Sequence, residues 1–262
     1  MSYTDFAEVY DILMGEVDYS GRSQYLLKLF KKHGKKPTLL LDLACGTGNF
    51  SIPLSKQGIE VIGVDMSEDM LAVAREKAMS ENENILFLCQ NAAELDLYGT
   101  VDGAVCCMDS LNHITDKEVL QKAINKVSLF LEEGCLFIFD VNTEYKHREI
   151  LGDNTFVFDE EEVYCVWQNS FCRESLTTDI CLDFFLPDGD GYIRTSEDFS
   201  ERAYTESELA EILEKANFEI IAIYDDMTEN PPTDKSERII YVTRRCGVRT
   251  DNSVQCLHTQ FG

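Results

Sequence analysis

The stretch that decides the fold is Leu41-Asp42-Leu43-Ala44-Cys45-Gly46-Thr47-Gly48-Asn49-Phe50. The apolar run 38–43 predicts a buried strand, and a helix is predicted to follow the loop through residue 54. The small residues Ala44, Gly46 and Gly48 let the backbone turn sharply and let a ligand approach it closely. A ligand held there would meet the positive end of the following helix. The stretch therefore predicts a strand–loop–helix unit that binds a ligand.

A second strand is predicted over 59–64, and the acidic residue Asp65 stands at its end. A carboxylate in that position can accept two hydrogen bonds from a ribose diol. Ser67 then opens a helix with acidic residues in its first turn, where the helix dipole favours them. The loop and the carboxylate together suit a cofactor that contains adenosine.

Strand and helix patterns alternate through the first two-thirds of the chain and resume near its end. Further apolar strands are predicted over 85–89, 101–107, 135–141, 218–224 and 238–243. Capping residues predict helix ends: Ser20 begins a helix that Gly34 ends, Thr115 with Glu118 begins one that Gly134 closes, and Thr205 with Glu208 begins a third. The alternation predicts an α/β fold, a Rossmann-like and mostly parallel seven-stranded sheet with helices on both faces.

Residues 155–204 break this alternation, because their apolar side chains recur every second residue and turn-forming residues separate the runs. We expect a small antiparallel β-sheet inserted into the main domain. The predicted main domain comprises 1–154 and 205–245, with an N-terminal helical cover over about 1–34. Residues 246–262 have no periodicity and are predicted to form a C-terminal tail.

Composition narrows the class of protein. The chain carries 23 basic and 48 acidic residues, a formal net charge of −25, which disfavours nucleic acid as a partner. No apolar run approaches the roughly 20 residues that span a bilayer, and residues 1–5 do not resemble a signal peptide, so we expect a cytoplasmic protein without a membrane partner. The 10 cysteines form no C-x-x-C pair and there are 4 histidines, so we expect free thiols and no metal site.

The loop differs from two other kinds of nucleotide-binding loop. A nicotinamide fingerprint needs a third glycine where this chain has Ser51, and Asp42 would lie awkwardly beside a pyrophosphate. The same carboxylate suits a sulfonium or an amino group. A nucleoside-triphosphate loop is excluded because no Gly-Lys-Ser/Thr follows the glycines.

These motifs resemble, in order, those of the class I S-adenosylmethionine (SAM)-dependent methyltransferases. Residues 41–50 resemble motif I, 61–67 the acidic motif of the second strand, 91–95 the segment that flanks adenine, and 101–105 with 109–113 the fourth-strand motif. Residues 6–11, 18–19 and 236–242 are also similar to small bacterial methyltransferases in which an N-terminal segment covers the cofactor and an antiparallel insert lies over the active site.

The resemblance implies a set of cofactor contacts. Asp42 and Gly46 would lie near the methionine part of SAM, Asp65 would hold the ribose hydroxyls, and Met66 would pack on the adenine. The implied cofactor-binding residues are Tyr10, Tyr19, Arg22, Asp42, Ala44, Gly46, Gly48, Asp65, Met66, Asn91, Ala92 and Asp109. Ordinary packing of an N-terminal helix stays open as the alternative for Tyr10, Tyr19 and Arg22.

The candidates for a catalytic part are His113, Asn112 and Tyr10. Methyl transfer depends mainly on positioning the two reactants, and a base is needed only if the acceptor arrives protonated. His113 could serve as that base, or it could be a histidine packed under a loop. Trp167, Arg173 and Arg194 could wall the acceptor pocket from the insert, which could instead be a dimerisation surface.

The predicted function is transfer of a methyl group from SAM to a small-molecule amine or hydroxyl acceptor, which leaves S-adenosylhomocysteine. A nicotinamide-dependent oxidoreductase and a non-catalytic SAM-binding protein are the alternatives, because a fold alone does not fix an activity. The chain is predicted to act as a monomer or a homodimer.

Overall fold

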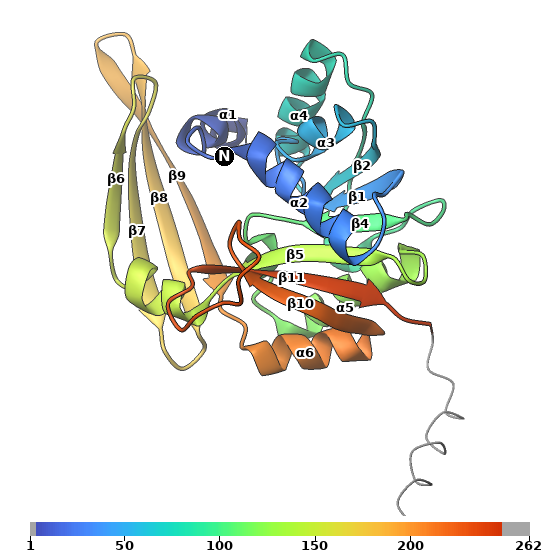
Figure 1. Cartoon of the computed structure of the whole chain (residues 1–262). Coiled ribbons are helices and arrows are strands. Elements are labelled where there is room, and N and C mark those ends of the chain that lie inside the picture. The colour runs from blue at the N-terminus through green and yellow to red at the C-terminus, as the bar shows by residue number, and fades with distance from the viewer. Residues whose placement is uncertain (1–3, 248–262) are drawn as a thin grey trace, which may run out of the picture.

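A seven-stranded sheet forms the centre of this computed structural model, which describes residues 4–247 (Figure 1). In the order in which they pair, its strands are β10 (Phe218–Asp225), β11 (Arg238–Arg245), β5 (Leu136–Asn142), β4 (Gly103–Cys106), β1 (Leu39–Leu43), β2 (Glu60–Asp65) and β3 (Leu86–Cys89). Six of its strands run in the same direction, and β11 is antiparallel to both of its neighbours. The predicted seven-stranded, mostly parallel sheet is confirmed.

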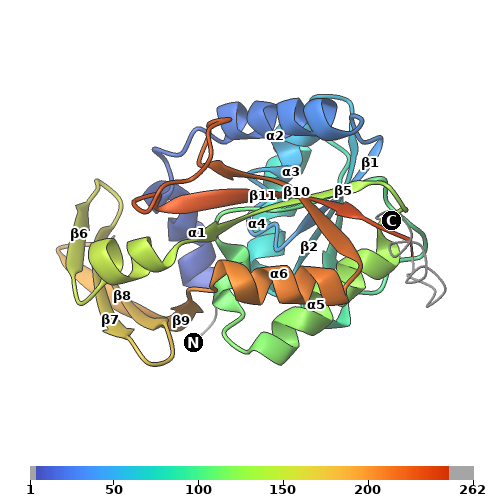
Figure 2. The ribbon, with the colours of Figure 1, turned by 60° about the horizontal axis from the view of Figure 1, so that its bottom comes forward.

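Helices cover both faces of the sheet, as Figure 2 shows. On one face, α2 (Tyr19–His33) and α3 (Ser51–Ser55) pack on side chains such as Leu40 and Ile138. On the other face, α5 (Lys117–Phe130) and α6 (Glu206–Lys215) pack on Leu41 and Phe137. Successive strand residues point to opposite faces, so each apolar strand supplies both cores.

The remaining helical elements gather around the loops. They are α1 (Thr4–Leu13), α4 (Glu68–Ser80), the 3₁₀ turns η1 (Ala92–Glu94) and η2 (Ser110–His113), and the π-helical turn η3 (Lys146–Leu151). Ser67 caps α4 by accepting a hydrogen bond from the amide of Met70, and Thr205 with Glu208 forms the predicted capping box of α6.

Three predicted helix ends are wrong. Asp18, two residues before Ser20, caps α2 by accepting one amide of its first turn. Asp116, next to Thr115, caps α5 by accepting two such amides. Gly34 follows α2 as predicted, whereas α5 ends at Phe130 and Gly134 serves the turn before β5 with φ of 80°.

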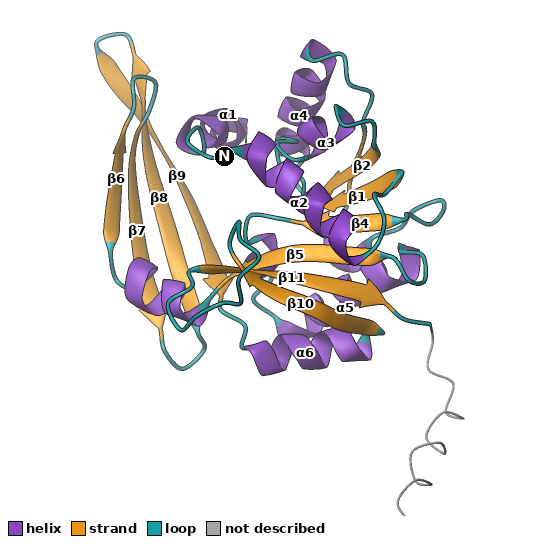
Figure 3. Cartoon of the chain, in the orientation of Figure 1, coloured by secondary structure: helices purple, strands orange, loops and turns teal. Residues whose placement is uncertain are grey.

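A second, four-stranded sheet stands beside the first (Figure 3). It pairs β6 (Thr155–Asp159), β7 (Tyr164–Cys172), β8 (Thr177–Asp188) and β9 (Gly191–Arg202), each antiparallel to the next. This sheet, called the inserted sheet below, confirms the predicted antiparallel segment. The domain boundaries at 154 and 204 stay a prediction, and of the predicted tail only Cys246 and Gly247 belong to the described residues.

One face of the inserted sheet is apolar and faces α1. Val9 of α1 packs in a cluster with Cys165, Ile180, Leu182 and Phe184. Because α1 also contacts α4, it lies between the inserted sheet and the loop after β1.

Within residues 4–247, no helix combines the length and the apolar character needed to cross a membrane. In the same part of the chain, no group of three or more His, Cys, Asp and Glu side chains is arranged to hold a metal ion, and each cysteine is a free thiol.

Candidate functional site

The loop after β1 turns through left-handed backbone conformations at Ala44, Gly46 and Gly48, with φ of 55°, 54° and 78°. A Cβ atom on Gly48 would come within 3.2 Å of the Cβ of Ala74 in α4, whereas one on Gly46 would meet no atom within 4 Å. Gly48 therefore packs the loop tightly on α4, and Gly46 leaves its backbone open to a ligand.

Asp65 lies against this loop, as its place at the end of β2 predicts. One carboxylate oxygen accepts the amide of Gly46 at 2.8 Å, and the other accepts the amide of Ser67 at 2.9 Å. Burial raises the pKa of Asp65, and these amide donors oppose that rise. The carboxylate thus ties β1 to β2 at the carboxyl edge of the sheet, where α/β folds bind ligands.

Asp42 is buried inside β1 with 2% of its surface exposed. Its carboxylate accepts a hydrogen bond from the hydroxyl of Ser51 at 2.5 Å. Burial raises the pKa of Asp42 to about 7, although the Ser51 bond opposes the rise. A buried carboxylate next to a ligand loop favours a ligand with positive charge.

A cavity of about 40 Å³ opens beside Asp42 and the loop. Tyr10 from α1 and Tyr19 from α2 line it together with Asp42, Ala44, Cys45, Gly46, Thr47, Asn49, Phe50, Cys107, Met108 and Ser110. The structure therefore brings the two predicted tyrosines to the loop that the sequence singled out.

Asp11 anchors α1 over the same loop. Its carboxylate accepts hydrogen bonds from the Thr47 hydroxyl at 2.7 Å and the Asn49 amide at 2.8 Å, and it pairs with Lys77 of α4 at 2.7 Å. Arg22, in contrast, is held away from the cavity lining by two hydrogen bonds to Asp226, at 2.9 and 2.7 Å. Sequence reasoning did not single out Asp11, because its partners come from two other elements.

The residues predicted to meet adenine lie outside the lining of this cavity. Met66 is 71% exposed directly after β2. Asn91 follows β3 and uses its side-chain oxygen to accept the amide of Ala93, and Ala92 lies half-buried on the core. Since β2 and β3 pair in parallel, Met66 and Asn91 stand at neighbouring strand ends.

The end of β4 is held in an unusual conformation. Met108 and Asp109 both have positive φ, 57° and 54°, which is costly for residues with side chains. The carboxylate of Asp140 accepts both of their amides, and Arg238 pairs with Asp109 and Asp140, each at 2.7 Å. Burial alone would raise the pKa of Asp109, but Arg238 holds it far below its usual range.

Asn112 is fully buried, and its side-chain amide forms hydrogen bonds with the backbone of two other segments. The amide nitrogen donates to the backbone oxygens of Asn142 and Arg202, and the amide oxygen accepts the Asn142 amide at 2.9 Å. Asn112 thus joins the edge of the large sheet to the end of β9.

His113 is exposed at the end of η2 and faces a glutamate that the sequence did not single out. Its Nε2 lies 3.6 Å from one carboxylate oxygen of Glu201 on β9, and its ring packs on Phe199 with 5.0 Å between ring centroids. Glu201 is only 4% exposed. Phe199 is the one apolar residue of the segment 195–202, so no alternation marks Glu201 as buried, and the pairing of β9 with β8 places it.

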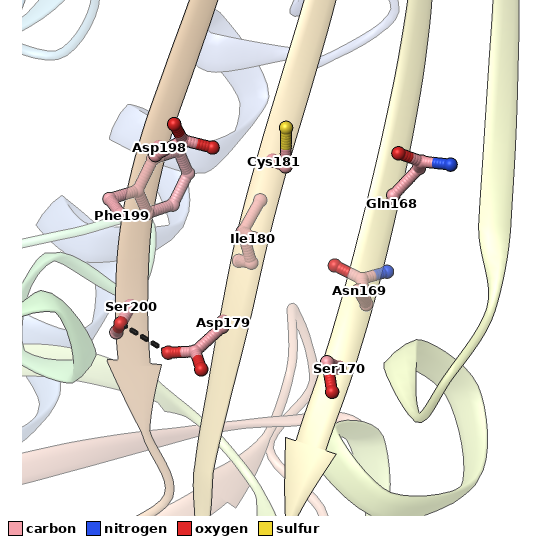
Figure 4. A pocket seen from close by; sticks show the side chains of 9 residues that line it. All are labelled: Gln168, Asn169, Ser170, Asp179, Ile180, Cys181, Asp198, Phe199 and Ser200. Atoms are coloured by element: carbon pink, nitrogen blue, oxygen red, sulfur yellow. Dashed lines mark hydrogen bonds between the residues drawn. The ribbon is translucent and has the colours of Figure 1, made fainter.

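A hollow of about 380 Å³ runs along β7, β8 and β9 (Figure 4). Its lining residues are Gln168, Asn169, Ser170, Asp179, Ile180, Cys181, Asp198, Phe199 and Ser200. Six of these side chains lie on the face opposite Glu201, so the hollow opens on that face, whereas Asn169, Ile180 and Phe199 form one row on the face of Glu201. The side-chain nitrogen of Asn169 is buried and has no hydrogen-bond partner among the described residues.

Trp167 and Arg194, two of the side chains predicted to wall the acceptor pocket, lie on opposite faces of the inserted sheet. Trp167 lies on the face that carries Phe199 and Glu201, where it packs between Phe156 and Phe158. Arg194 lies on the other face and pairs with Asp183 at 2.8 Å. The alternation of β9 places Arg194 and Glu201 on opposite faces, which sequence reasoning did not resolve.

Comparisons with known proteins agree with these features. The family described as "Methyltransferase domain" matches residues 40–134. A relative named as a methyltransferase, YqeM from Bacillus subtilis (strain 168), is 32% identical to this chain. The match covers 94% of this chain and 98% of YqeM. A crystal structure of a SAM-dependent methyltransferase from Clostridium acetobutylicum ATCC 824 is 33% identical with a TM-score of 0.84, and the match covers 94% of this chain and 99% of that one. CcbJ from Streptomyces caelestis, 21% identical with a TM-score of 0.77 over 92% of this chain and 96% of its own, shares the fold.

Proposed function

Because the chain belongs to the class I SAM-dependent methyltransferases, we propose that it methylates a small-molecule amine or hydroxyl acceptor held between the loop after β4 and the inserted sheet. The family relationship selects SAM over a nicotinamide cofactor. The observation that carries the choice of acceptor is the contact of the His113 ring with Phe199, because it brings the inserted sheet over the carboxyl edge of the large sheet and narrows the access that a polymer would need.

The residues of the β1 loop fit the cofactor. The open backbone at Gly46 and the buried carboxylate of Asp42 suit the charged methionine part of SAM, and Asp65 stands where a ribose would come. We assign the adenine to the neighbouring ends of β2 and β3, where Met66 would pack on it and Asn91 and Ala92 would meet its edge. When bound, SAM supplies a methyl group on a sulfonium.

Residues of α1 and α2 would close this site. Tyr10 and Tyr19 line the cavity, and the contacts of Asp11 hold α1 on the loop. A closed site excludes water and fixes the direction of approach, which is where most of the rate of a methyl transfer arises. Gly48 and Ala44 shape the loop, and Asp109 supports the end of β4 through Arg238.

The acceptor would lie beside Phe199, on the face of the inserted sheet that carries Glu201. The ring of Phe199 can cover part of its carbon skeleton. His113, next to Phe199, is the group best placed to take a proton from an acceptor that arrives protonated. The net charge of −25 favours a cationic or neutral acceptor over nucleic acid.

The test measures S-adenosylhomocysteine formed from SAM by the full-length chain. The acceptors offered are a panel of small amines and small alcohols and phenols and, in parallel, bulk transfer RNA and a denatured protein. We expect S-adenosylhomocysteine to form with at least one small acceptor. With that acceptor, His113→Gln should have a reduced kcat and an unchanged dissociation constant for SAM. If S-adenosylhomocysteine forms only when transfer RNA or the denatured protein is present, and with no small acceptor, the proposal is overturned.

A further inference from the structure

Glu201 is a buried carboxyl group placed between two imidazole rings. Its two oxygens lie 3.6 Å from Nε2 of His113 and 3.7 Å from Nε2 of His147. His147 is fully buried at the start of η3, and its other ring nitrogen lies 2.8 Å from the hydroxyl of Thr178 on β8. A row of polar groups therefore runs from the exposed His113 into the joint between the two sheets.

The groups around Glu201 come from every element packed against it. Asn142 of β5 donates to the carboxylate at 3.2 Å, and Asp109 after β4 adds a negative charge nearby. Lys146 and Arg238 add weaker positive fields. Burial and then Asp109 raise the pKa of Glu201 to about 8, whereas burial lowers the pKa of His147 to about 4.

Burial lowers the pKa of His113, although Asp109 and Asp65 oppose the fall, so near neutral pH the pair of His113 and Glu201 holds one proton. A neutral His147 can accept a hydrogen bond but carries no charge, so it leaves the proton with the carboxyl group and the neighbouring ring. Because a charge on either group acts on the other across 3.6 Å, the two titrate as a pair and not one by one. The π-helical turn that places His147 is a rare element that recurs at functional sites.

We propose that Glu201 is a positioning residue that shares a proton with His113, so that strand β9 of the inserted sheet sets the charge of the imidazole at the acceptor site. The role rests on the proposed function, in which His113 takes a proton from the acceptor. That step starts from the pair after its shared proton has left to solvent, with a neutral ring and an ionised Glu201: the N–H or O–H bond of the acceptor breaks, its electron pair stays on the acceptor atom, and a new N–H bond forms on the ring. The carboxylate of Glu201 then stabilises the imidazolium.

The test is a titration of the histidine rings by NMR in the full-length chain without any ligand. Of the four histidines, His113 is identified by the signal that His113→Gln removes. In the wild type we expect the His113 signal to report a second titration step above pH 7. In Glu201→Gln that step should vanish, because an amide does not ionise, and the ring should titrate in a single step. Glu174→Gln, the same change at an exposed turn of the inserted sheet, should leave the curve unchanged.

Two results would overturn the inference. One is a wild-type His113 that titrates in a single step within the ordinary histidine range, which needs no variant. The other is the same curve in wild type and Glu201→Gln. If Glu201→Gln does not fold, Glu201→Asp keeps a carboxyl group with a shorter reach and should give an intermediate curve, and one identical to wild type would count against the pairing. Failure of the proposed function would appear separately, as absence of S-adenosylhomocysteine with every small acceptor.

Discussion

Replacing Asp42 by Asn should stabilise the ligand-free protein, and more so as the pH rises. Asp42 is buried in β1, its one hydrogen bond from the Ser51 hydroxyl can be kept by an amide oxygen, and its pKa is raised to about 7 by burial. The side chain of Asn has nearly the same shape and cannot ionise. The substitution therefore removes the cost of a buried charge and little else.

The magnitude follows from the two pKa values. An aspartate in an unfolded chain ionises near 3.9, so wild-type stability decreases as the pH rises from about 4 to about 7 and then levels off. At 1.36 kcal/mol per pH unit the full penalty reaches about 4 kcal/mol as an upper value, and about 2 kcal/mol of it develops between pH 5.5 and 8.5. The free energy of unfolding of Asp42→Asn should exceed that of wild type by an amount that grows by about 2 kcal/mol over this range.

Urea unfolding of both proteins at pH 5.5, 7.0 and 8.5, extrapolated to water, measures the difference. Asp96→Asn changes an exposed aspartate in the same way and should show no growing difference. A difference between Asp42→Asn and wild type that stays constant or shrinks as the pH rises would refute the reasoning.

Three further predictions concern the same site. Asp65→Ala removes the acceptor of two backbone amides and should weaken binding of S-adenosylhomocysteine by roughly 1.5–3 kcal/mol, so an unchanged dissociation constant in calorimetry would show that the ribose lies elsewhere. Gly63→Ala places a Cβ 2.6 Å from the Phe87 ring and should cost about 1–3 kcal/mol in urea unfolding, and an unchanged midpoint would contradict the close packing. Asp11→Asn removes the ion pair between α1 and Lys77. Because that pair is partly exposed, stability should change by less than about 1 kcal/mol while affinity for S-adenosylhomocysteine falls roughly 10-fold; equal affinity would mean that α1 does not cover the cofactor.

The elements that the sequence predicted correctly are those that depend on residues close together along the chain. Apolar runs gave the strands of the large sheet, and the glycines at 46 and 48 gave the loop, because a left-handed turn restricts which residues fit. Asp65 could be placed beside that loop since the carboxyl ends of neighbouring parallel strands meet at one edge.

What the sequence did not show depends on contacts between distant segments. Glu201 and His113 meet only because β9 returns from the inserted sheet to the end of β4, and Arg22 faces Asp226 because the loop after β10 folds over α2. Each of these side chains looks like an ordinary surface charge in its own segment. Charge pairs of this kind follow from the tertiary fold and leave no local periodicity to detect.

SAM is proposed to bind at the loop after β1, under α1, with its methyl group directed toward His113. A crystal structure of the full-length chain with S-adenosylhomocysteine tests this placement most directly. We expect the ribose hydroxyls within about 3.2 Å of the Asp65 carboxylate, the adenine beside Met66, and the sulfur on the side of the cavity that opens toward the inserted sheet. A ribose held by other residues, or a sulfur directed away from His113 and Phe199, would contradict it.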